Sequence, residues 1–337
     1  MTVVGPFGLS VRDQALEADV QAGLAAVEEG LFEATKSDVP FITEAARHLV
    51  RAGGKRFRPL LVTLAAQFGD PYAPGVVPSA VVVELTHLAT LYHDDVMDEA
   101  DVRRGVPSAN ANWENSVAVL TGDFLFARAS QILADLGPEA VRIQAEAFER
   151  LVTGQIMETA GPAEGHDPID HYLDVIAGKT GSLIAVAGRY GAMMSGADER
   201  TVSVLTQYCE RIGIAFQLAD DVLDIASDAC ESGKTPGTDL REGIPTLPVL
   251  YVRERAASPE GTAEDRELSE LLAGDLSDDG RHAEALAALR AHPALERARR
   301  STVRYADEAR EMLAPLPANA AKSALASLCT AVVDRAG

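Results

Sequence analysis

The sequence predicts an all-α fold, and three observations support this. Apolar residues recur at intervals of three and four along most of the chain, which is the spacing of one face of a helix. Aromatic residues make up only 5% of the sequence, while alanine, leucine, glutamate and arginine, which favour helices, are abundant. We find no regular series of alternating strands joined by Asn-Gly or Asp-Gly turns.

Length and composition indicate a globular protein. A chain of 337 residues with 47% hydrophobic and 24% charged residues can form a sizeable core, and without an evident linker we expect one domain over residues 1–337. The formal charge of −21 argues against binding to nucleic acids or anionic membranes, because both are negative themselves. The longest run without a charged residue, residues 71–83, contains three prolines and predicts no membrane span.

Cysteine usage points to a reducing compartment. Cys209, Cys230 and Cys329 show none of the spacings of a metal site. Because their number is odd and the N-terminus lacks a basic leader, we expect reduced thiols that serve as packing residues in a cytoplasmic protein.

The N-terminal part is interpreted as scaffold followed by a basic cluster. Helical periodicity runs from about Ser10 to Leu49, and Pro40 begins a new segment within it. Residues 53–59, Gly-Gly-Lys-Arg-Phe-Arg-Pro, then precede an apolar helix. A glycine-rich turn that enters a helix presents backbone N–H groups, and Lys55 and Arg58 add charge, so an anion such as diphosphate could bind here. Neutralisation of nearby surface acids is the alternative.

The chain is organised around residues 84–104, which follow a connector at residues 71–78. Asp94 and Asp98 are four residues apart, so their carboxylates lie side by side on a helical stripe that also contains Glu84 and His87. Like charges at this spacing destabilise a helix, which suggests that a cation binds there. A single motif of this kind could instead be a solvated acidic face.

Two arginines follow the first acidic motif. Arg103 and Arg104 lie where the helix gives way to a loop at residues 105–107, beside the aspartates. Their planar guanidinium groups suit phosphate oxygens. Ion pairs with Glu99 and Asp101 are the alternative, more plausible for one arginine than for both.

Lys179, near the middle of the chain, is a further candidate for anion binding. Three helices are predicted before it, over residues 111–117, 122–126 and 140–159. Lys179 then lies between a glycine and Thr180 in an apolar helix. Because a lone buried ammonium is unfavourable, Lys179 needs an anionic partner, which is either a ligand or an internal acid. The segment is not a P-loop, since the glycine spacing fails and no strand precedes it.

The acidic motif occurs a second time. Residues 216–224 read Phe-Gln-Leu-Ala-Asp-Asp-Val-Leu-Asp, and both copies contain Asp-Asp-Val-(Met or Leu)-Asp after an apolar run. Two such helices facing each other across a cavity would supply hard oxygen ligands for Mg²⁺, completed by water and substrate phosphate. Neither copy resembles the calcium loop of an EF-hand. The repetition makes two unrelated solvated faces an unfavoured interpretation.

The C-terminal third begins with a long loop. Residues 227–248, which include Lys234, are rich in glycine, proline and polar residues, and loops of this length often act as lids. Further helices are expected from Tyr251 to Gly337, with connectors near residues 258–262 and 275–281.

Together these motifs resemble those of the trans-isoprenyl diphosphate synthases, the chain-elongating polyprenyl synthetases of isoprenoid biosynthesis. The resemblance covers about residues 53–248, and the shared motifs are Gly-Gly-Lys-Arg-x-Arg-Pro, both Asp-Asp-x-x-Asp motifs, Arg-Arg-Gly, Gly-Lys-Thr and Gly-Lys-x-x-Gly-Thr-Asp-Leu. It implies an isoprenoid-synthase helical bundle around a central cavity, a homodimer, Mg²⁺ as cofactor, and isopentenyl diphosphate and an allylic diphosphate as substrates.

The resemblance also implies residue roles. The Mg²⁺ ligands would be Asp94, Asp98 and Asp220, supported by Asp95, Asp221 and Asp224. The allylic diphosphate would contact Arg103, Lys179, Gln217 and Lys234, with Thr180 nearby. Isopentenyl diphosphate would be held by Lys55, Arg58, His87 and Arg104. Ile244 stands where many relatives have a lysine, so one diphosphate contact is missing.

Three alternatives stay open. A class I terpene cyclase also ionises a diphosphate, but its second metal motif usually differs from its first, and Lys55, Arg58 and His87 would have no second substrate to bind. A non-catalytic synthase subunit could lose aspartates, whereas all six are present here. The third alternative is a short-chain farnesyl or geranylgeranyl diphosphate synthase.

Small residues before the first motif allow a prediction of product length. A product tied to the aspartates would run back along their helix, past Ala89, which lies roughly 7.5 Å along the axis at about 1.5 Å per residue. Short-chain relatives often have an aromatic residue near this position. Ala89 and Thr86 leave the path open, so we expect a medium- or long-chain product beyond geranylgeranyl length, unless a bulky residue from another helix closes the path.

Overall fold

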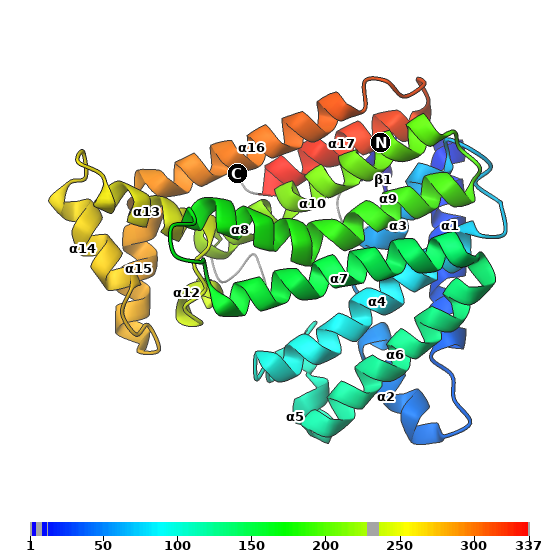
Figure 1. The fold of residues 1–337 in the computed structure, drawn as a ribbon, viewed down its shortest axis with the longest axis horizontal. Helices are drawn as coiled ribbons and strands as arrows, with labels where there is room; N and C mark the ends of the chain where they lie inside the picture. The colour runs from blue at the N-terminus through cyan, green and yellow to red at the C-terminus, as the bar shows by residue number, and fades with distance from the viewer. Residues whose placement is uncertain (1, 5–8, 12, 228–235, 336–337) are drawn as a thin grey trace. The chain divides into compact units, whose positions relative to one another are not determined.

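A computed structural model describes residues 2–4, 9–11, 13–227 and 236–335, and these residues are mainly helical (Figure 1). The strands are short and form two antiparallel pairs: β1 (Thr2–Val4) with β2 (Leu9–Val11), and β3 (Val102–Arg103) with β4 (Val106–Pro107). The all-α prediction is therefore confirmed. The expected helical start near Ser10 was wrong, because the first helix begins at Gln14.

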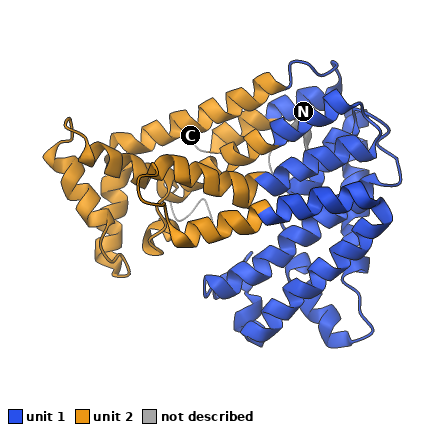
Figure 2. Ribbon diagram, viewed as in Figure 1, with its two compact units in different colours: residues 1–149, 182–209, 313–327 blue, residues 150–181, 210–312, 328–337 orange. Residues whose placement is uncertain are grey.

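The chain divides into two compact units, shown in Figure 2. Unit 1 comprises residues 1–149, 182–209 and 313–327, and unit 2 comprises residues 150–181, 210–312 and 328–337. The division falls within three helices, α7 (Pro138–Ala160), α10 (Glu199–Ala226) and α17 (Ala320–Arg335). Because each unit collects three separate stretches of chain, a search for a linker could not locate this division. The single domain remains a prediction.

Helix α4 is the centre of unit 1. The other helices that lie wholly in this unit are α1 (Gln14–Ala34), α2 (Pro40–Arg51), α3 (Phe57–Ala66), α5 (Ala109–Trp113), α6 (Asn115–Leu136) and α9 (Ser182–Met194). Helix α4 (Val76–Met97) packs against α1, α3, α6 and α9. Its first four turns are apolar on almost every side, as expected for a helix covered by neighbours all round.

Local sequence explains where these helices begin. Pro40 is the first residue of α2, as predicted, and Pro78 lies in the first turn of α4, where a missing N–H breaks no helical hydrogen bond. The predicted connector at residues 71–78 therefore ends earlier, at Gly75. Helices α5 and α6 are separated at Glu114, whose φ of 76° is incompatible with a continuous helix.

In unit 2, helix α13 (Leu247–Ala257) packs against α8 (Pro168–Ile176), α14 (Ala263–Leu272) and α16 (Pro293–Met312). Helix α15 (Asp279–Ala291) contacts α14, α16 and α12 (Thr238–Arg241). The predicted connector at residues 258–262 is confirmed between α13 and α14. The second, predicted near residues 275–281, lies between α14 and α15 but ends earlier, because α15 begins at Asp279. The predicted loop at residues 227–248 contains the short α12 and the start of α13.

The predicted lysine helix is a composite. Between α8 and α9 the chain forms one π-helical segment, η1 (Ala177–Gly181), a wide turn that is uncommon and often found at functional sites. The backbones of η1 and α7 meet at two glycines, since a Cβ on Gly178 would lie 3.2 Å from the Cα of Gly154. Side chains at these positions would force the two segments apart.

Helix α6 is long and apolar enough to cross a membrane by length and composition, although the charge-free run predicted no span. The two results differ because a search for uninterrupted uncharged residues stops at each charge, whereas the composition of α6 is apolar even though it contains Asp123 and Arg128. A third of its most apolar window, 33%, is buried in the protein. Cys209 and Cys329 are buried thiols, as predicted, and Cys230 lies outside the described residues.

Candidate functional site

The first aspartate motif lies at the C-terminal end of α4 and has a buried middle. Asp95 is fully buried, whereas the side chain of Asp98 is 49% exposed and Asp94 is partly exposed. The Nε atom of Arg103 donates to Oδ1 of Asp95 at 2.5 Å, and the guanidinium also lies 3.7 Å from Asp98. Burial raises the pKa of Asp95, and the hydrogen bond from Arg103 opposes this. Arg103 thus pairs with the motif itself.

A hairpin positions Arg103. The predicted loop after the motif forms the β3–β4 pair, in which Arg103 lies opposite Val106. Arg104 and Gly105 make the turn with φ values of 54° and 76°. Glycine adopts this left-handed region readily, whereas Arg104, the first turn residue, is held in it while its side chain makes hydrogen bonds to backbone carbonyl oxygens.

Arg104 and Arg56 converge on one buried acid, Glu84. The Nη1 atom of Arg56 donates to Glu84 at 3.0 Å, and Nη2 of Arg104 lies 4.0 Å from the same carboxylate. Arg56 also pairs with Glu28, and Arg104 donates to the Gly53 carbonyl oxygen. The glycine-rich turn before α3 is therefore tied to α4 and to the hairpin. Neither predicted ion pair, with Glu99 or Asp101, forms among the interactions of the described residues.

Three further residues of the predicted diphosphate site lie around this cluster. Lys55 is exposed on the turn. Burial lowers the pKa of Arg58 to about 10, so it stays charged at neutral pH, and its buried Nε atom has no hydrogen-bond acceptor among the described residues. Burial, followed by the nearby arginines, lowers the pKa of His87 well below its usual value. A neutral histidine beside buried guanidinium groups is a setting that an anion would stabilise.

The second motif, on α10, repeats the buried middle. Asp221 is 3% exposed, whereas the side chain of Asp220 is 38% exposed. The Tyr172 hydroxyl donates to Oδ2 of Asp221, and Nε2 of Gln217 donates to Oδ1 at 3.0 Å. Burial raises the pKa of Asp221 to about 7, an effect that the adjacent carboxylates reinforce.

The two outer aspartates of the second motif have other partners. The Nη2 atom of Arg335, in the last turn of α17, donates to Asp220 at 2.8 Å. Asp224 accepts hydrogen bonds of 3.2 Å from the backbone N–H groups of Thr238 and Asp239 at the start of α12. Asp224 thus holds part of the predicted lid, residues 227–248. Lys234, which that prediction placed on the diphosphate, lies outside the described residues.

Segment η1 presents the predicted lysine and threonine. The Lys179 ammonium lies 2.6 Å from Glu158, so an internal acid is its partner in the protein alone. The Thr180 hydroxyl donates to the side-chain amide oxygen Oε1 of Gln217 at 3.3 Å. Gln217 therefore joins η1 to Asp221.

Sequence reasoning missed Arg56, Tyr172 and Arg335. Tyr172 bonds Asp221, 49 residues away in the sequence, and local spacing gave no signal for this pair. Arg335 pairs across a long sequence separation and gave none.

The residues predicted to set product length lie in packed surroundings. Ala89 and Thr86 are both buried in unit 1. The amide nitrogen of Gln144 donates to the Thr86 hydroxyl at 2.9 Å, and a Cβ on Gly122 would lie 3.1 Å from the Ala89 carbonyl oxygen. Their role in product length stays a prediction.

The carboxylates of the first aspartate motif are suitable ligands for Mg²⁺. Within the described residues no three His, Cys, Asp or Glu side chains gather as one metal-binding group. Mg²⁺ is usually bound through one or two carboxylates, with water and substrate phosphate supplying the rest, so a three-residue group is not required. Asp94 and Asp98 offer such a pair at a helix end, and Oδ2 of Asp95 is buried without a hydrogen-bond donor among the described residues. The first motif therefore fits Mg²⁺ chemically.

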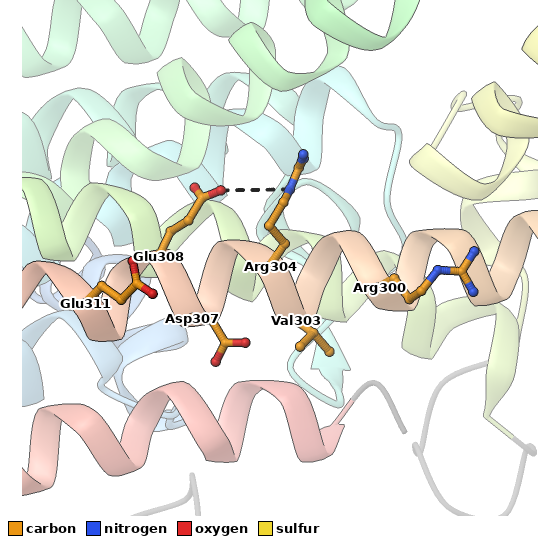
Figure 3. Close-up of a pocket in the computed structure, with 6 residues that line it drawn as sticks. All are labelled: Arg300, Val303, Arg304, Asp307, Glu308 and Glu311. Carbon is orange, nitrogen blue, oxygen red and sulfur yellow. Dashed lines mark ion pairs between the residues drawn. The ribbon is translucent and has the colours of Figure 1, made fainter.

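A surface depression of about 470 Å³ lies on α16, away from these motifs in sequence (Figure 3). Its lining residues are Arg300, Val303, Arg304, Asp307, Glu308 and Glu311. Arg304 pairs with Glu308 across it. Because its charges are mixed and it includes no predicted site residue, we do not assign the chemistry to it.

The fold and the two aspartate motifs define a prenyltransferase of the isoprenoid-synthase type. The polyprenyl synthetase model matches residues 39–289, which is most of the chain. The chain belongs to the polyprenyl synthetase family. The predictions of this family, its fold and a prenyltransferase activity are thereby confirmed.

Relatives with different product lengths resemble this chain. It is 49% identical to the nonaprenyl diphosphate synthase of Mycobacterium tuberculosis, over 98% of this chain and 97% of the relative. The geranylgeranyl pyrophosphate synthase of Corynebacterium glutamicum, in complex with calcium and isoprenyl diphosphate, has a TM-score of 0.85 and 44% identity over 97% and 99% of the two chains. The decaprenyl diphosphate synthase of Rhodobacter capsulatus has a TM-score of 0.86 and 36% identity over 96% and 99%.

Proposed function

We propose that this protein condenses isopentenyl diphosphate with an allylic diphosphate in a Mg²⁺-dependent reaction and releases an all-trans polyprenyl diphosphate. One observation carries the proposal: in both aspartate motifs the middle carboxylate is buried and fixed, while the outer two are partly exposed. A motif of this kind combines a rigid anchor with acids that a metal can reach. Two such motifs suit Mg²⁺, which would neutralise the negative charge of the diphosphate.

The allylic substrate would bind through the outer aspartates and nearby donors. Mg²⁺, when bound, supplies positive charge that stabilises the leaving diphosphate. The proposed ligands are Asp94, Asp98 and Asp220, with Asp224 in support. Arg103 and Lys179 would add charge-assisted hydrogen bonds, for which each exchanges its internal acid, and Lys234 would join from the lid.

The second substrate would bind at the basic cluster of unit 1. Arg58 and Arg104 offer partly buried positive charge, Lys55 adds an exposed ammonium, and neutral His87 adds one N–H donor. Glu84 would keep the arginines oriented without cancelling all of their charge. Isopentenyl diphosphate held here would present its double bond to the allylic carbocation, and the released diphosphate would accept the proton. A closed lid would exclude water, which otherwise quenches the cation.

We propose a product longer than geranylgeranyl diphosphate. The relatives named nonaprenyl and decaprenyl synthases support this length, while the geranylgeranyl synthase of similar identity supports a shorter one. Small residues before the first motif, Ala89 and Thr86, favour the longer product because they form no bulky floor.

We also propose a cytoplasmic homodimer that uses α6 as its interface. Leu120 on α6 is 66% exposed, and Val119 beside it is exposed as well. A second copy would cover this apolar face and remove it from water. Leu120→Glu should convert the dimer into a monomer in light scattering coupled to size-exclusion chromatography. A wild type that runs as a monomer would contradict the dimer.

Incubation of the purified protein with Mg²⁺, farnesyl diphosphate and labelled isopentenyl diphosphate tests the proposed activity. We expect labelled polyprenyl diphosphate, and none after chelation of the metal. Cyclic hydrocarbon without label would identify a terpene cyclase, and no turnover would identify a non-catalytic subunit. A labelled product that stops at geranylgeranyl length would identify a short-chain synthase.

A further inference from the structure

Asp221 is held on both carboxylate oxygens by neutral donors. The Tyr172 hydroxyl donates to Oδ2, and the Gln217 amide nitrogen donates to Oδ1 at 3.0 Å. The side chain is 3% exposed, so water does not compete for these bonds. With both oxygens engaged, Asp221 is an anchor whose orientation is fixed, in contrast to the partly exposed Asp220 beside it.

The same hydrogen bonds join three segments of unit 2. Tyr172 belongs to α8, and Gln217 and Asp221 belong to α10. The side-chain oxygen Oε1 of Gln217 accepts from the Thr180 hydroxyl of η1 at 3.3 Å. Because α8 runs directly into η1, these bonds attach both the helix before the π-helical segment and Thr180 within that segment to α10. The orientation of the second aspartate motif is thereby linked to the segment that bears Lys179.

We propose that Tyr172 is a positioning residue for the condensation, acting through Asp221 to orient Asp220 and Asp224 toward the metal-bound diphosphate. This inference rests on the proposed function. The chemistry of the donor matters: a phenol hydroxyl fixes the Asp221 side chain and brings no positive charge that would compete with a cation bound by Asp220 and Asp224. The first motif differs, since Asp95 is held by the charged Arg103.

Tyr172→Phe tests the inference because it removes one oxygen and keeps the ring. We expect kcat to fall about tenfold and the affinity for Mg²⁺, measured by calorimetry with the metal and inorganic diphosphate, to fall several-fold. The KM for isopentenyl diphosphate should stay within about twofold, because the basic cluster of unit 1 is untouched.

Tyr190→Phe is the matched control. Its buried hydroxyl donates to the Ala140 carbonyl oxygen at 2.7 Å, in unit 1 and on no predicted site residue. Both variants lose one buried hydrogen bond, so their melting temperatures should fall by similar amounts. Only Tyr172→Phe should change Mg²⁺ binding and kcat. Equal changes in kcat and Mg²⁺ affinity in the two variants, measured below both melting temperatures, would show that Tyr172 is merely structural.

A double-mutant cycle with Asp221→Asn tests the route of the effect. If Tyr172 acts through Asp221, the double variant should be no worse in kcat or Mg²⁺ affinity than Asp221→Asn alone. Additive losses would overturn the inference. Elongation by the wild type is assayed in parallel, so failure of the proposed function is recognised separately from failure of the Tyr172 role.

Discussion

The Nε atom of Arg103 donates to Oδ1 of Asp95 at 2.5 Å and fixes the buried carboxylate of the first aspartate motif. Helix geometry explains why this aspartate differs from its neighbours. Asp94 and Asp98, four residues apart, share one face of α4, whereas Asp95 is rotated by about 100° toward the interior. The same rotation places Asp221 in the interior of unit 2, where Tyr172 replaces the arginine as donor.

Removal of the Arg103 guanidinium should destabilise the protein through Asp95. Arg103→Gln leaves a buried carboxylate without its cation, and we expect a loss of about 1–3 kcal/mol in the free energy of unfolding. Asp95→Asn removes the charge that needs compensation, so the double variant should lose less than the sum of the single losses. Urea denaturation of the four proteins measures this coupling. Strictly additive losses would mean that the pair contributes nothing.

The aspartates of the two motifs form an exposed group and a buried group. We expect substitutions in the two groups to have different effects on turnover and melting temperature. Asp94→Ala and Asp220→Ala should lower turnover by orders of magnitude and leave the melting temperature of the metal-free protein almost unchanged, because deletion of one acid relieves repulsion. Asp221→Ala should lower both, since it leaves the buried donors of Tyr172 and Gln217 without an acceptor. Thermal melts and elongation assays separate the groups. Asp94→Ala or Asp220→Ala variants that melt far below the wild type would show that the outer aspartates are structural.

Arg335 should compete with Mg²⁺ for Asp220. Its Nη2 atom lies 2.8 Å from Asp220, and its guanidinium stacks 4.9 Å from the centre of the Phe216 ring. A partly exposed pair of this kind contributes about 0.2–1 kcal/mol, so Arg335→Gln should tighten Mg²⁺ binding by about 1.4- to fivefold in calorimetry. Arg310→Gln, which breaks an exposed pair with Asp307 on α16, is the control. Weaker Mg²⁺ binding by Arg335→Gln would contradict the competition.

Acid stability should depend on a carboxylate outside the site, Asp265. Hydrogen bonds from the Thr262 backbone N–H and then from His292 hold the pKa of Asp265 well below its usual value. A lowered folded-state pKa stabilises the protein above the unfolded-state pKa, near 3.9, and this contribution disappears as the pH falls through the folded-state pKa.

Asp265→Asn should therefore reduce the urea midpoint by a constant amount between pH 7 and about pH 5, and by progressively less at lower pH. Asp307→Asn, at an exposed position on α16, should show almost no difference at any pH. A gap between wild type and Asp265→Asn that widens on acidification would reverse the predicted sign.

Helices and the outer aspartates were predictable because both depend on spacing within one element. The periodicity of apolar residues and the start of α2 at Pro40 required no knowledge of tertiary contacts. The spacing of Asp94 and Asp98 fixed their common face in the same way.

Partners from other elements were not predictable in this way. Spacing indicates that Glu84 and Asp98 share a stripe, but not that Arg56 and Arg104 reach Glu84 from two separate turns. Tyr172 and Asp221 are brought together by the packing of α8 against α10, which leaves no mark on the local sequence of either. The β3–β4 hairpin depends on a left-handed Arg104, a conformation that composition does not reveal.

The last prediction concerns product length. Ala89 is buried one and a half turns before Asp94, and its surroundings are packed, because Gly122 of α6 approaches its carbonyl oxygen. A growing chain would have to pass this point if it follows α4. Ala89→Phe should therefore move the end of the path toward the aspartates and shorten the product, while condensation continues because no reacting group changes.

Overpacking of a buried position costs about 1–3 kcal/mol, so the melting temperature of Ala89→Phe is measured first. Ala89→Ser, which adds a single oxygen at the same position, is the matched control and should keep the wild-type product. Chromatography of the dephosphorylated products decides the outcome. The expected series is a wild-type product longer than geranylgeranyl, an unchanged serine variant and a shorter phenylalanine variant; a folded, active Ala89→Phe enzyme with wild-type product length would exclude a path past Ala89.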